Sequence, residues 1–266
     1  MKIIRGREIA DKILKELKEK ISQQNLELGL AVVLVGQNEA SELYVRLKKK
    51  AAEEAGIKFK LYNFTEKNSE PEIIELIKNL NTDKNITGII VQLPLPEKFN
   101  TQKIISSIAP EKDADGFSGE SQSLPVFPSA IMRLAESSEQ EVSGKFGIVV
   151  ANSKEFGETM VGMLEQKKNK SKYILVKDLE NSLDLIKKAD IIITAVGKPK
   201  LISGNMLKEG VIVIDGGISK INGKVVGDVD FESVKNIISA ISPVPGGVGP
   251  VTIACLLENV YRLTKK

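Results

Sequence analysis

The chain has 266 residues, of which 42% are hydrophobic and 27% charged, and its formal net charge is +3. This composition is typical of an ordinary globular protein, and so small a charge gives no support for a nucleic-acid partner. The single cysteine, Cys255, excludes an internal disulfide, and the lack of histidine argues against a zinc site or a histidine-based triad, so we expect no metal.

The chain also lacks the marks of a membrane protein. No apolar run approaches the roughly 20 residues that are needed to cross a bilayer. The first 20 residues form an amphipathic helical pattern without the apolar core and cleavage site of a secretory signal. We therefore expect a cytoplasmic protein with no membrane role.

Strand-like apolar runs alternate with helical patterns along the chain. The apolar runs predict strands over residues 30–35, 88–93, 146–150, 173–176, 191–195 and 211–214. Helical periodicity covers residues 41–55, where Ser41 is placed to cap the helix, and residues 182–188. This alternation is typical of an α/β protein with mostly parallel sheets.

A passage rich in Ser, Gly and Pro separates the two halves of the chain. It covers residues 117–144, and we interpret it as the connection between two domains. The second half then begins with a strand, a turn and a helix, which is the order expected of a nucleotide-binding unit.

The helix over residues 41–55 carries the first candidate site residues. Tyr44 and Lys48 are four residues apart and therefore project from one face of the helix. An aromatic ring can stack on a flat heterocycle, while an amine whose pKa is lowered by burial or by neighbouring lysines can exchange protons with water. The alternative is that Lys48 belongs to a solvated run with Lys49 and Lys50.

Two further segments carry polar side chains where a ligand could bind. In GIIVQLPLP, Gln92 lies at the carboxyl end of an apolar strand, the end at which open α/β sheets bind ligands. The amide could equally be satisfied by a neighbouring loop. In PEKDADGF, Asp115 precedes a glycine, which is typical of a turn, although Asp115 could also cap a helix.

Taken together, these segments resemble a known enzyme family. YVxxK, VQLPLP and KDxDGF, in this order, look like the catalytic half of the bifunctional methylenetetrahydrofolate dehydrogenase/cyclohydrolase family, the FolD type of bacteria. ADIIITAVGKP, GVIVIDGGI, GKVVGDVDF and SPVPGGVGPVT are similar to its nucleotide domain and final helix. The resemblance covers nearly the whole chain.

The resemblance implies a two-domain α/β fold. We expect a folate-binding catalytic domain of residues 1–120 plus 251–266, and a Rossmann-like NAD(P)-binding domain of residues 121–250. The carboxyl-terminal helix, beginning near Val251, is expected to return to the first domain.

The resemblance also implies an activity. It is the oxidation of 5,10-methylenetetrahydrofolate to the 5,10-methenyl form with NADP, and hydrolysis of that product to 10-formyltetrahydrofolate. Such an enzyme serves one-carbon metabolism and purine biosynthesis. The family needs no metal and is commonly homodimeric, and we expect the same here.

The resemblance assigns roles to individual residues. In the family, the residue matching Lys48 is the acid/base group, that matching Tyr44 packs on the folate, that matching Gln92 tunes the lysine, and that matching Asp115 anchors the pterin. Further substrate contacts are expected at Val91, Leu93, Pro245, Gly246 and Gly247. Cofactor contacts are expected at Ser153, Gly157, Val196, Gly197, Gly217, Ile218 and Thr252.

The nucleotide loop differs from the family pattern. In VVANSKEFGETM, Ala151 and Thr159 replace the usual first glycine and the proline, and no arginine stands in the turn to meet the 2′-phosphate of NADP. Glu155 and Glu158 add negative charge where a pyrophosphate would approach the helix.

The choice between NADP and NAD stays open at the next loop. Lys177 could contact a 2′-phosphate, whereas Asp178 stands at the spacing from the loop glycine at which an acidic residue holds an NAD ribose. Both could also be ordinary loop charges.

Three alternative functions remain. The chain could be a cyclohydrolase that has lost its dehydrogenase activity, or a non-catalytic folate-binding paralogue. The third alternative is a Rossmann dehydrogenase for another small substrate, which would make VQLPLP and DGF coincidental.

Overall fold

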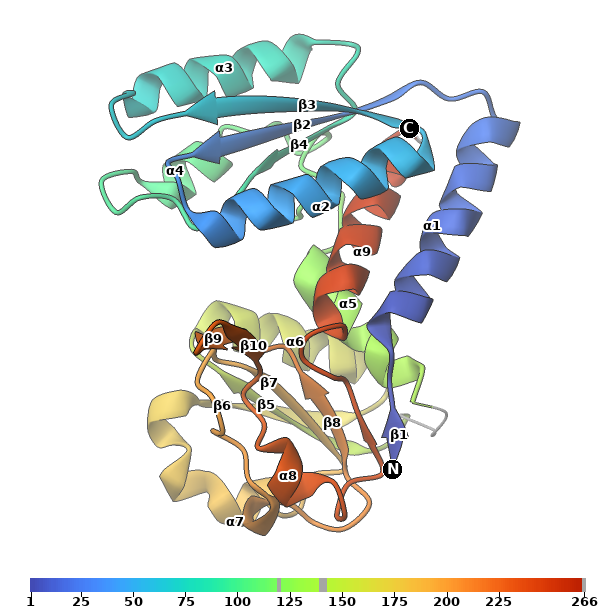
Figure 1. Ribbon diagram of the computed structural model, residues 1–266, viewed down its shortest axis with the longest axis vertical. Coiled ribbons are helices and arrows are strands. Elements are labelled where there is room, and N and C mark those ends of the chain that lie inside the picture. The colour runs from blue at the N-terminus through green and yellow to red at the C-terminus, as the bar shows by residue number, and fades with distance from the viewer. Residues whose placement is uncertain (119–120, 139–142, 265–266) are drawn as a thin grey trace. The chain divides into compact units, whose positions relative to one another are not determined.

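The computed structural model describes residues 1–118, 121–138 and 143–264 of the chain. The chain divides into two compact units (Figure 1). The three-stranded unit comprises Asp11–Val126 and Ile253–Lys266, and the six-stranded unit comprises Met1–Ala10 and Phe127–Thr252. Both units are α/β structures, which confirms the predicted fold class.

The three-stranded unit is built on a short parallel sheet. Its central strand β2 (Leu28–Val35) pairs with β3 (Ile57–Phe64) on one side and with β4 (Gly88–Val91) on the other. Strands β2 and β4 are buried along their whole length, as expected of parallel strands covered on both faces. The helices are α1 (Gly6–Gln23), α2 (Glu39–Ala55), α3 (Glu70–Thr82), α4 (Thr101–Ile105) and α9 (Val248–Arg262).

Successive side chains of β2 point to opposite faces of this sheet. Ala31 and Val33 belong to the core under α3 and α4, together with Ile73 and Ile77. On the other face, Gly88 leaves room for α9, because a Cβ atom at Gly88 would lie 3.0 Å from a methyl group of Val260. Residues 253–262 of the final helix therefore pack within the three-stranded unit, as expected, whereas its first five residues belong to the other unit.

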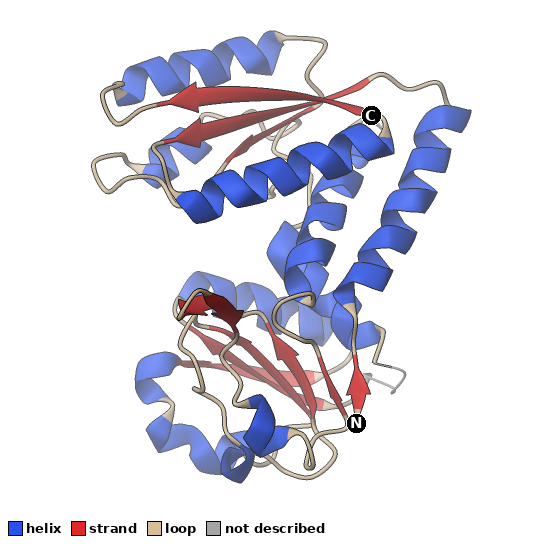
Figure 2. Cartoon of the chain, in the orientation of Figure 1, coloured by secondary structure: helices blue, strands red, loops and turns tan. Residues whose placement is uncertain are grey.

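The six-stranded unit contains a fully parallel sheet of order β1-β11-β8-β7-β5-β6 (Figure 2). The strands are β1 (Lys2–Ile3), β5 (Phe146–Ala151), β6 (Lys170–Leu175), β7 (Ile191–Ala195), β8 (Ile212–Asp215) and β11 (Ala240–Ile241). The helices are α5 (Val126–Glu136), α6 (Lys154–Gln166), α7 (Leu183–Ile186) and α8 (Phe231–Val234), with short 3-10 turns η1 (Val176–Asp178), η2 (Glu180–Ser182) and η3 (Gly204–Met206). A hairpin of β9 (Ser219–Ile221) and β10 (Lys224–Val226) completes the unit.

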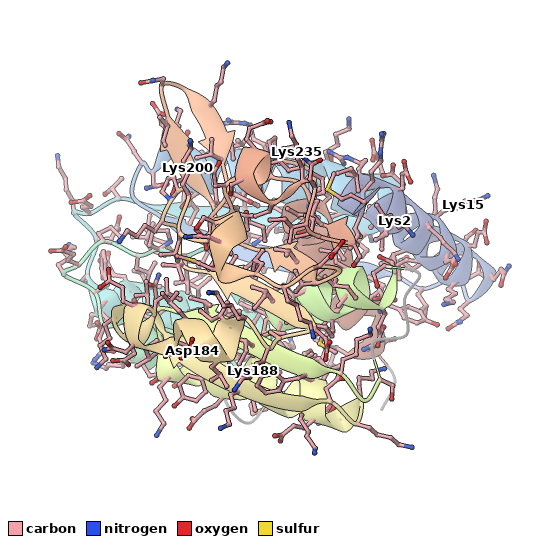
Figure 3. All side chains as sticks on the ribbon, turned by 90° about the horizontal axis from the view of Figure 1, so that it is seen from below. Lys2, Lys15, Asp184, Lys188, Lys200 and Lys235 are labelled. Atoms are coloured by element: carbon pink, nitrogen blue, oxygen red, sulfur yellow. The ribbon has the colours of Figure 1, made fainter. Side chains whose placement is uncertain are left out.

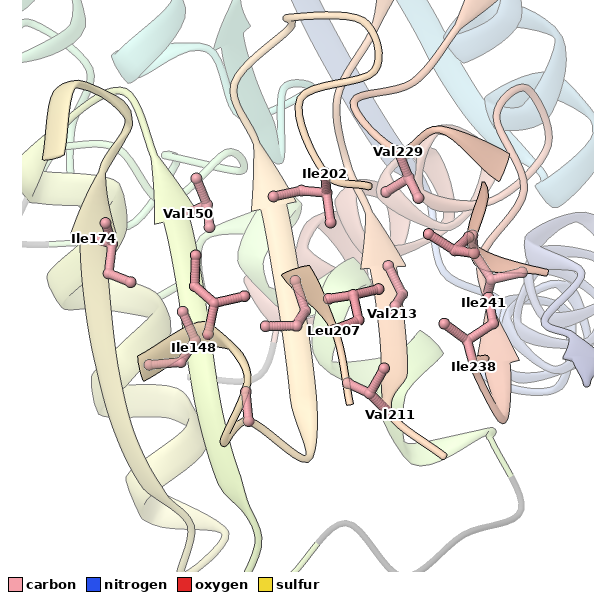
Figure 4. Packing of buried hydrophobic residues seen from close by; sticks show 14 of the residues in the cluster. Ile148, Val150, Ile174, Ile202, Leu207, Val211, Val213, Val229, Ile238 and Ile241 are labelled. Carbon is pink, nitrogen blue, oxygen red and sulfur yellow. The ribbon is translucent and has the colours of Figure 1, made fainter. Parts of the chain in front are cut away.

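Branched aliphatic side chains fill the core of the six-stranded unit. Ile148, Val150 and Val213 contribute to one cluster on a single face of the sheet, where Ile202 and Val229 pack against them (Figure 4). Figure 3 shows Lys15, Lys188, Lys200 and Lys235 extending from the ribbon, and all four are exposed.

Each of the two parallel sheets has a point at which the chain reverses its direction of strand addition. From β2 the chain adds β3 on one side and then β4 on the other, and from β5 it adds β6 and then β7 in the same way. Ligands of open α/β sheets bind beyond the carboxyl ends of the strands at such a point. The topology therefore offers one candidate ligand edge in each unit.

The predicted strands each overlap an observed strand, but several details differ. Strand β3 was not predicted. Helix α2 begins at Glu39 with Asn38 as its cap, so the assignment of Ser41 as the cap was wrong. Helix α9 begins at Val248 rather than near Val251.

The first ten residues also differ from the expectation. They group with the six-stranded unit, because β1 pairs with β11 at Lys2↔Ala240 and Ile3↔Ile241. The passage over 117–144 contains helix α5, and its residues 119–120 and 139–142 lie outside the described part of the chain. Within the described residues, no helix is long and apolar enough to span a membrane.

Candidate active site

Helix α2 carries an amine into the interior of the three-stranded unit. The Asn38 side chain caps the helix by accepting a hydrogen bond from Ser41 N at 3.0 Å. Lys48 is only 7% exposed. Its neighbours Lys49 and Lys50 are exposed and pair with glutamates one turn later. Lys48 therefore does not belong to a solvated run, and that alternative is wrong.

The buried amine contacts the side chain of Gln92. Lys48 Nζ donates to Gln92 Oε1 at 2.9 Å, and Gln92 Nε2 donates to Leu93 O at 2.7 Å. Because its nitrogen is engaged, the amide presents its oxygen to the amine. Both the charged and the neutral amine carry N–H donors, so the contact persists when Lys48 loses a proton.

Burial shifts the titration of this amine and of a nearby carboxyl group. It lowers the pKa of Lys48, and the charge of Asp115 partly opposes that shift. Burial also raises the pKa of Asp115, an effect that Lys48 opposes and Asp113 reinforces. An amine with a lowered pKa is neutral over a wider range of pH, so it can accept a proton from water and return it.

Asp115 lies in a turn that runs beside β4. The turn is closed by Asp113, which is 1% exposed and accepts hydrogen bonds from Gly116 N at 3.0 Å and Ser118 N at 2.8 Å. Asp113 also lies opposite Ile89 of β4 in a parallel bridge. No helix begins at Asp115, so its alternative reading as a helix cap was wrong.

A residue of the final helix holds the same turn. Asn259 Nδ2 donates to Ala114 O at 2.9 Å and to Leu124 O at 2.8 Å. Sequence reasoning missed both Asn259 and Asp113. The available signals were a polar side chain within the apolar segment ACLLENV and the first aspartate of KDADGF.

The other predicted substrate residues of this unit lie close in the chain to Lys48 or to its partner Gln92. Tyr44 lies one turn before Lys48, is partly buried, and has its pKa raised by burial. Val91 is the last residue of β4 and is buried, whereas Leu93 is partly buried. The Leu93 carbonyl also accepts from the Ser41 hydroxyl at 3.4 Å. An aromatic ring, apolar side chains and a buried amine thus belong to one unit.

The β5–α6 turn of the six-stranded unit contains two of the predicted cofactor residues. Ser153 caps α6 by accepting from Phe156 N at 3.2 Å. Gly157 allows α6 to pack closely on the sheet, because a Cβ atom there would lie 2.6 Å from the ring of Tyr173. A strand, a tight turn and a close-packed helix are the elements that receive a pyrophosphate in dinucleotide-binding folds.

Acidic side chains stand at this helix terminus. Glu155 is exposed, and its pKa is lowered by a hydrogen bond from its own backbone N–H and by one from the Ser153 side chain. Glu158 lies 3.5 Å from the Lys154 amine. The Glu155 carboxylate therefore already accepts hydrogen bonds at the amino terminus of α6, where a pyrophosphate would bind.

Val196 and Gly197 follow strand β7 at the carboxyl edge of the sheet. Asn152 Nδ2 donates to Val196 O at 2.5 Å, and Ser219 Oγ donates to Gly197 O at 2.7 Å. A Cβ atom at Gly197 would lie 3.4 Å from Ile218 O. The structure thus brings the predicted residues Val196, Gly197 and Ile218 together with the β5–α6 turn.

Gly217 and Thr252 lie in the same unit but in different settings. Gly217 follows β8, and its N–H donates to Asp215 Oδ1 at 2.9 Å. The Thr252 hydroxyl donates to Val248 O at 3.0 Å within α9. The Thr252 side chain is therefore engaged by its own helix.

The glycine-rich loop between β11 and α9 contains Pro245, Gly246 and Gly247. Gly246 has a φ of +100°, a conformation that L side chains rarely adopt. The loop packs against the start of α1, because a Cβ atom at Gly6 would overlap Gly247 O, at 1.8 Å. These residues belong to the six-stranded unit, unlike Lys48. Within the described residues, no group of three or more His, Cys, Asp or Glu side chains could hold a metal ion.

Comparison with known proteins decides the family. The model of the tetrahydrofolate dehydrogenase/cyclohydrolase catalytic domain matches residues 4–115, and that of the NAD(P)-binding domain of the same family matches residues 125–266. The chain belongs to the tetrahydrofolate dehydrogenase/cyclohydrolase family. The predicted family is thereby confirmed.

Individual members of the family are similar to this chain over nearly their whole length. The bifunctional protein FolD of Acetivibrio thermocellus is 41% identical, over 99% of this chain and 97% of the relative. The crystal structure of the bifunctional FolD enzyme of Campylobacter jejuni has a TM-score of 0.93 and 41% identity, covering 100% of this chain and 99% of that one. The Trypanosoma brucei enzyme, solved with NADP cofactor and an inhibitor, has a TM-score of 0.92 and 31% identity, covering 99% and 97%.

Proposed function

We propose that the protein oxidises 5,10-methylenetetrahydrofolate to the 5,10-methenyl form with a nicotinamide nucleotide and hydrolyses that product to 10-formyltetrahydrofolate. The observation that carries this proposal is the buried contact between Lys48 Nζ and Gln92 Oε1, at 2.9 Å, in a unit that also holds Asp115. The family to which the chain belongs is named for both activities.

The hydrolytic step uses the proton exchange that Lys48 allows. The oxygen of water forms a bond to the methenyl carbon, and one water proton passes to neutral Lys48 and then to solvent. The bond from that carbon to N5 of the folate breaks, the second water proton ends on N5, and the formyl group remains on N10. Burial lowers the pKa of Lys48, so a neutral amine is more accessible than in water.

The side chains beside the amine would hold the substrate during this step. The Tyr44 ring offers a stacking surface, and the Asp115 carboxyl group can accept hydrogen bonds from the donors of a pterin ring. Burial raises the pKa of Asp115, which also makes a protonated, donating form accessible. These roles of Tyr44 and Asp115 are part of the proposal.

The residues at the carboxyl edge of the six-stranded sheet fit a nicotinamide nucleotide. Ser153, Gly157, Val196 and Gly197 would hold it, since Gly157 permits the close helix that such a nucleotide requires. A bound nucleotide supplies the acceptor for the hydride that leaves the methylene carbon. In this proposal, the chain contributes binding and orientation.

We propose NADP as the preferred nucleotide, with NAD as the alternative. Lys177 and Asp178 are both exposed in η1, directly after β6. Lys177 would pair with a 2′-phosphate, whereas Asp178 would accept from a ribose hydroxyl. The ratio of kcat/KM for NADP to that for NAD tests this choice. In Lys177→Ala the ratio should fall, and in Asp178→Ala it should rise.

A second candidate function is a cyclohydrolase without dehydrogenase activity. The exposed Glu155 and Glu158 at the start of α6 favour it, because a carboxylate there opposes the approach of a pyrophosphate. One experiment separates the candidates. Absorbance is followed for 5,10-methylenetetrahydrofolate with NADP, with NAD and with neither, beside hydrolysis of the 5,10-methenyl form and a Lys48→Ala control.

The outcomes of that experiment are distinct. Nucleotide reduction that disappears in Lys48→Ala supports the bifunctional enzyme, and hydrolysis alone supports the cyclohydrolase. No reaction in either assay would contradict both and favour a non-catalytic folate-binding paralogue. A homodimer, a cytoplasmic location and a part in purine biosynthesis are further proposals taken from the family resemblance, and light scattering of the purified protein tests the first.

A further inference from the structure

Two carboxyl groups are buried at the carboxyl edge of the six-stranded sheet, and the proposed chemistry uses neither. Asp215 is the last residue of β8 and is 3% exposed, and Asp228, in the loop after β10, is 1% exposed. Burying a carboxylate is costly unless hydrogen bonds replace its lost water. The hydrogen bonds that these two carboxylates accept therefore indicate what they hold.

Asp228 holds the segment that follows β7. Its carboxylate accepts from Thr194 Oγ1, Val196 N and Lys198 N, each at 2.7 Å. Gly197, between the two amide donors, has a φ of +77°, so the backbone curves around the carboxylate. Three short charge-assisted hydrogen bonds therefore fix the conformation of the segment that follows β7.

Asp215 in turn holds the loop that carries Asp228. Its Oδ1 accepts from Gly217 N at 2.9 Å and Asp228 N at 3.1 Å, and its Oδ2 accepts from Val229 N at 3.0 Å. Ser242, which follows β11, accepts from Asp215 N at 2.8 Å. One hydrogen-bonded chain thus connects the ends of β7, β8 and β11.

Two glycines make this arrangement possible. A Cβ atom at Gly217 would lie 2.1 Å from the Asp228 carboxylate, and one at Gly227 would lie 2.1 Å from Asp215 Oδ2. Each carboxylate therefore packs directly against a glycine backbone, and larger residues at these positions would displace it.

We propose that Asp228 is a positioning residue for the nicotinamide nucleotide, because it fixes the backbone of Val196 and Gly197 at the edge of the sheet where the nucleotide is expected to bind. The inference rests on the proposed function. In it, Asp228 does not touch the nucleotide, since its oxygens are engaged by Thr194, Val196 and Lys198.

Asparagine at position 228 would disturb this edge while keeping the size of the side chain. The amide has only one oxygen, so its NH2 group would face an N–H or O–H group that now donates a hydrogen bond to the carboxylate. The expected result for Asp228→Asn is a rise of about tenfold or more in Kd and KM for NADP, because charged hydrogen bonds of this kind are among the stronger ones. Nucleotide-independent hydrolysis of the 5,10-methenyl substrate should stay within about twofold of the wild type.

Asp230→Asn is the matched control. Asp230 lies two residues further on, and its carboxylate is 3.8 Å from the exposed Lys200 amine. Because a surface pair contributes little, this variant should bind NADP and hydrolyse substrate as the wild type does. Calorimetric titration with NADP and with NAD measures binding apart from turnover.

A second pair of variants keeps the test decisive if Asp228→Asn fails to fold. Thr194→Val removes one donor to Asp228, and Thr194→Ser retains it. We expect weaker NADP binding in Thr194→Val by about threefold and near-normal binding in Thr194→Ser, since one neutral hydroxyl donor contributes less than the whole set.

The outcomes separate the inference from the proposed function. If the wild type binds neither NADP nor NAD, the dehydrogenase proposal itself fails. If the wild type binds NADP and the Asp228→Asn and Thr194→Val variants bind it equally well, the positioning role is wrong. If Asp228→Asn binds NADP normally but hydrolyses poorly, Asp228 acts elsewhere and the inference is also overturned.

Discussion

Lys48 Nζ lies 2.9 Å from Gln92 Oε1, and the amide that receives this hydrogen bond is itself oriented by the Leu93 carbonyl. The two side chains come from α2 and from the residue that follows β4. A neutral acceptor beside a buried amine stabilises the charged form less than a carboxylate would. The pKa of Lys48 therefore stays lowered by burial.

Replacing Gln92 by glutamate tests this relationship. In Gln92→Glu a negative charge stands beside Lys48 and should raise its pKa, so the acid limb of the pH profile for hydrolysis moves to higher pH. The activity at neutral pH should fall and recover in part as the pH rises. Gln102→Glu, at an exposed position of α4, is the control and should leave the profile unchanged. An unshifted profile in Gln92→Glu would contradict the role of Gln92.

The lowered pKa of Lys48 should also make the stability of the protein depend on pH. The folded pKa of Lys48 is below its ordinary value of 10.5, so the folded state binds fewer protons than the unfolded state between the two values. The contribution of Lys48 to stability therefore improves as the pH rises through that interval. The free energy of unfolding of Lys48→Met should exceed that of the wild type by most at neutral pH. This difference should shrink as the pH approaches 10.5.

Urea unfolding at several pH values measures that difference. Lys49→Met is the control, because Lys49 is exposed on the same helix. Both variants remove one lysine, so only the effect of burial differs between them. A constant difference between wild type and Lys48→Met across the range would contradict the lowered pKa.

Asp215 provides a second stability test, in the other unit. Burial is the main cause that raises its pKa from 3.8 to about 6, although hydrogen bonds from Asp228 N and Val229 N act in the opposite direction. A raised carboxyl pKa means that the folded state binds more protons, so stability declines as the pH rises from about 4 to about 6. At about 1.4 kcal/mol per pH unit, the whole change amounts to about 3 kcal/mol.

Asp215→Asn removes this titration. The variant loses an acceptor oxygen, so its free energy of unfolding at pH 4 should be below that of the wild type. The difference between the two free energies should narrow by up to about 3 kcal/mol by pH 7, because the wild type loses stability over that interval. Thermal or urea unfolding at both pH values gives the difference in free energy of unfolding between wild type and variant. Equal differences at the two pH values would show that Asp215 does not titrate in this interval.

Asn259 should matter for both stability and substrate binding. Asn259→Ala leaves Ala114 O and Leu124 O without their donor, which should cost about 1–3 kcal/mol of unfolding free energy. Because Asp115 follows Ala114, the KM for the folate substrate should rise more than the KM for NADP. Arg262→Ala, exposed on the same helix, should change neither. Equal effects on both KM values would contradict a local role at the turn.

The sequence predicted those parts of the site that local pattern or family motif can carry. Gln92 stands out as an amide at the end of an apolar strand, and Tyr44 and Lys48 share a helical face. Burial of Lys48 could not be predicted from the run of three lysines, because only the packing of α2 on β2 and β3 decides which of them points inward.

The missed features depend on contacts between segments far apart in the chain. Asn259 contacts Ala114, 145 residues away, and Asp228 contacts Thr194, 34 residues away. Strand β1 joins a sheet whose neighbouring strand begins at Ala240. Neither helical periodicity nor strand alternation contains such information, which arises only when the sheet edges assemble.

Glu155 allows a test of the altered nucleotide loop. Its exposed carboxylate accepts hydrogen bonds at the start of α6, where a pyrophosphate would approach. Glu155→Gln removes that negative charge and should tighten NADP binding by about twofold to fivefold at low salt, the range expected for one charge at a helix terminus. Added salt should reduce the gain, because exposed charges are screened. Glu165→Gln, near the other end of the same helix, is the control, and calorimetric titration at two salt concentrations gives the affinities. Weaker NADP binding in Glu155→Gln would instead mean that this carboxylate helps to hold the nucleotide.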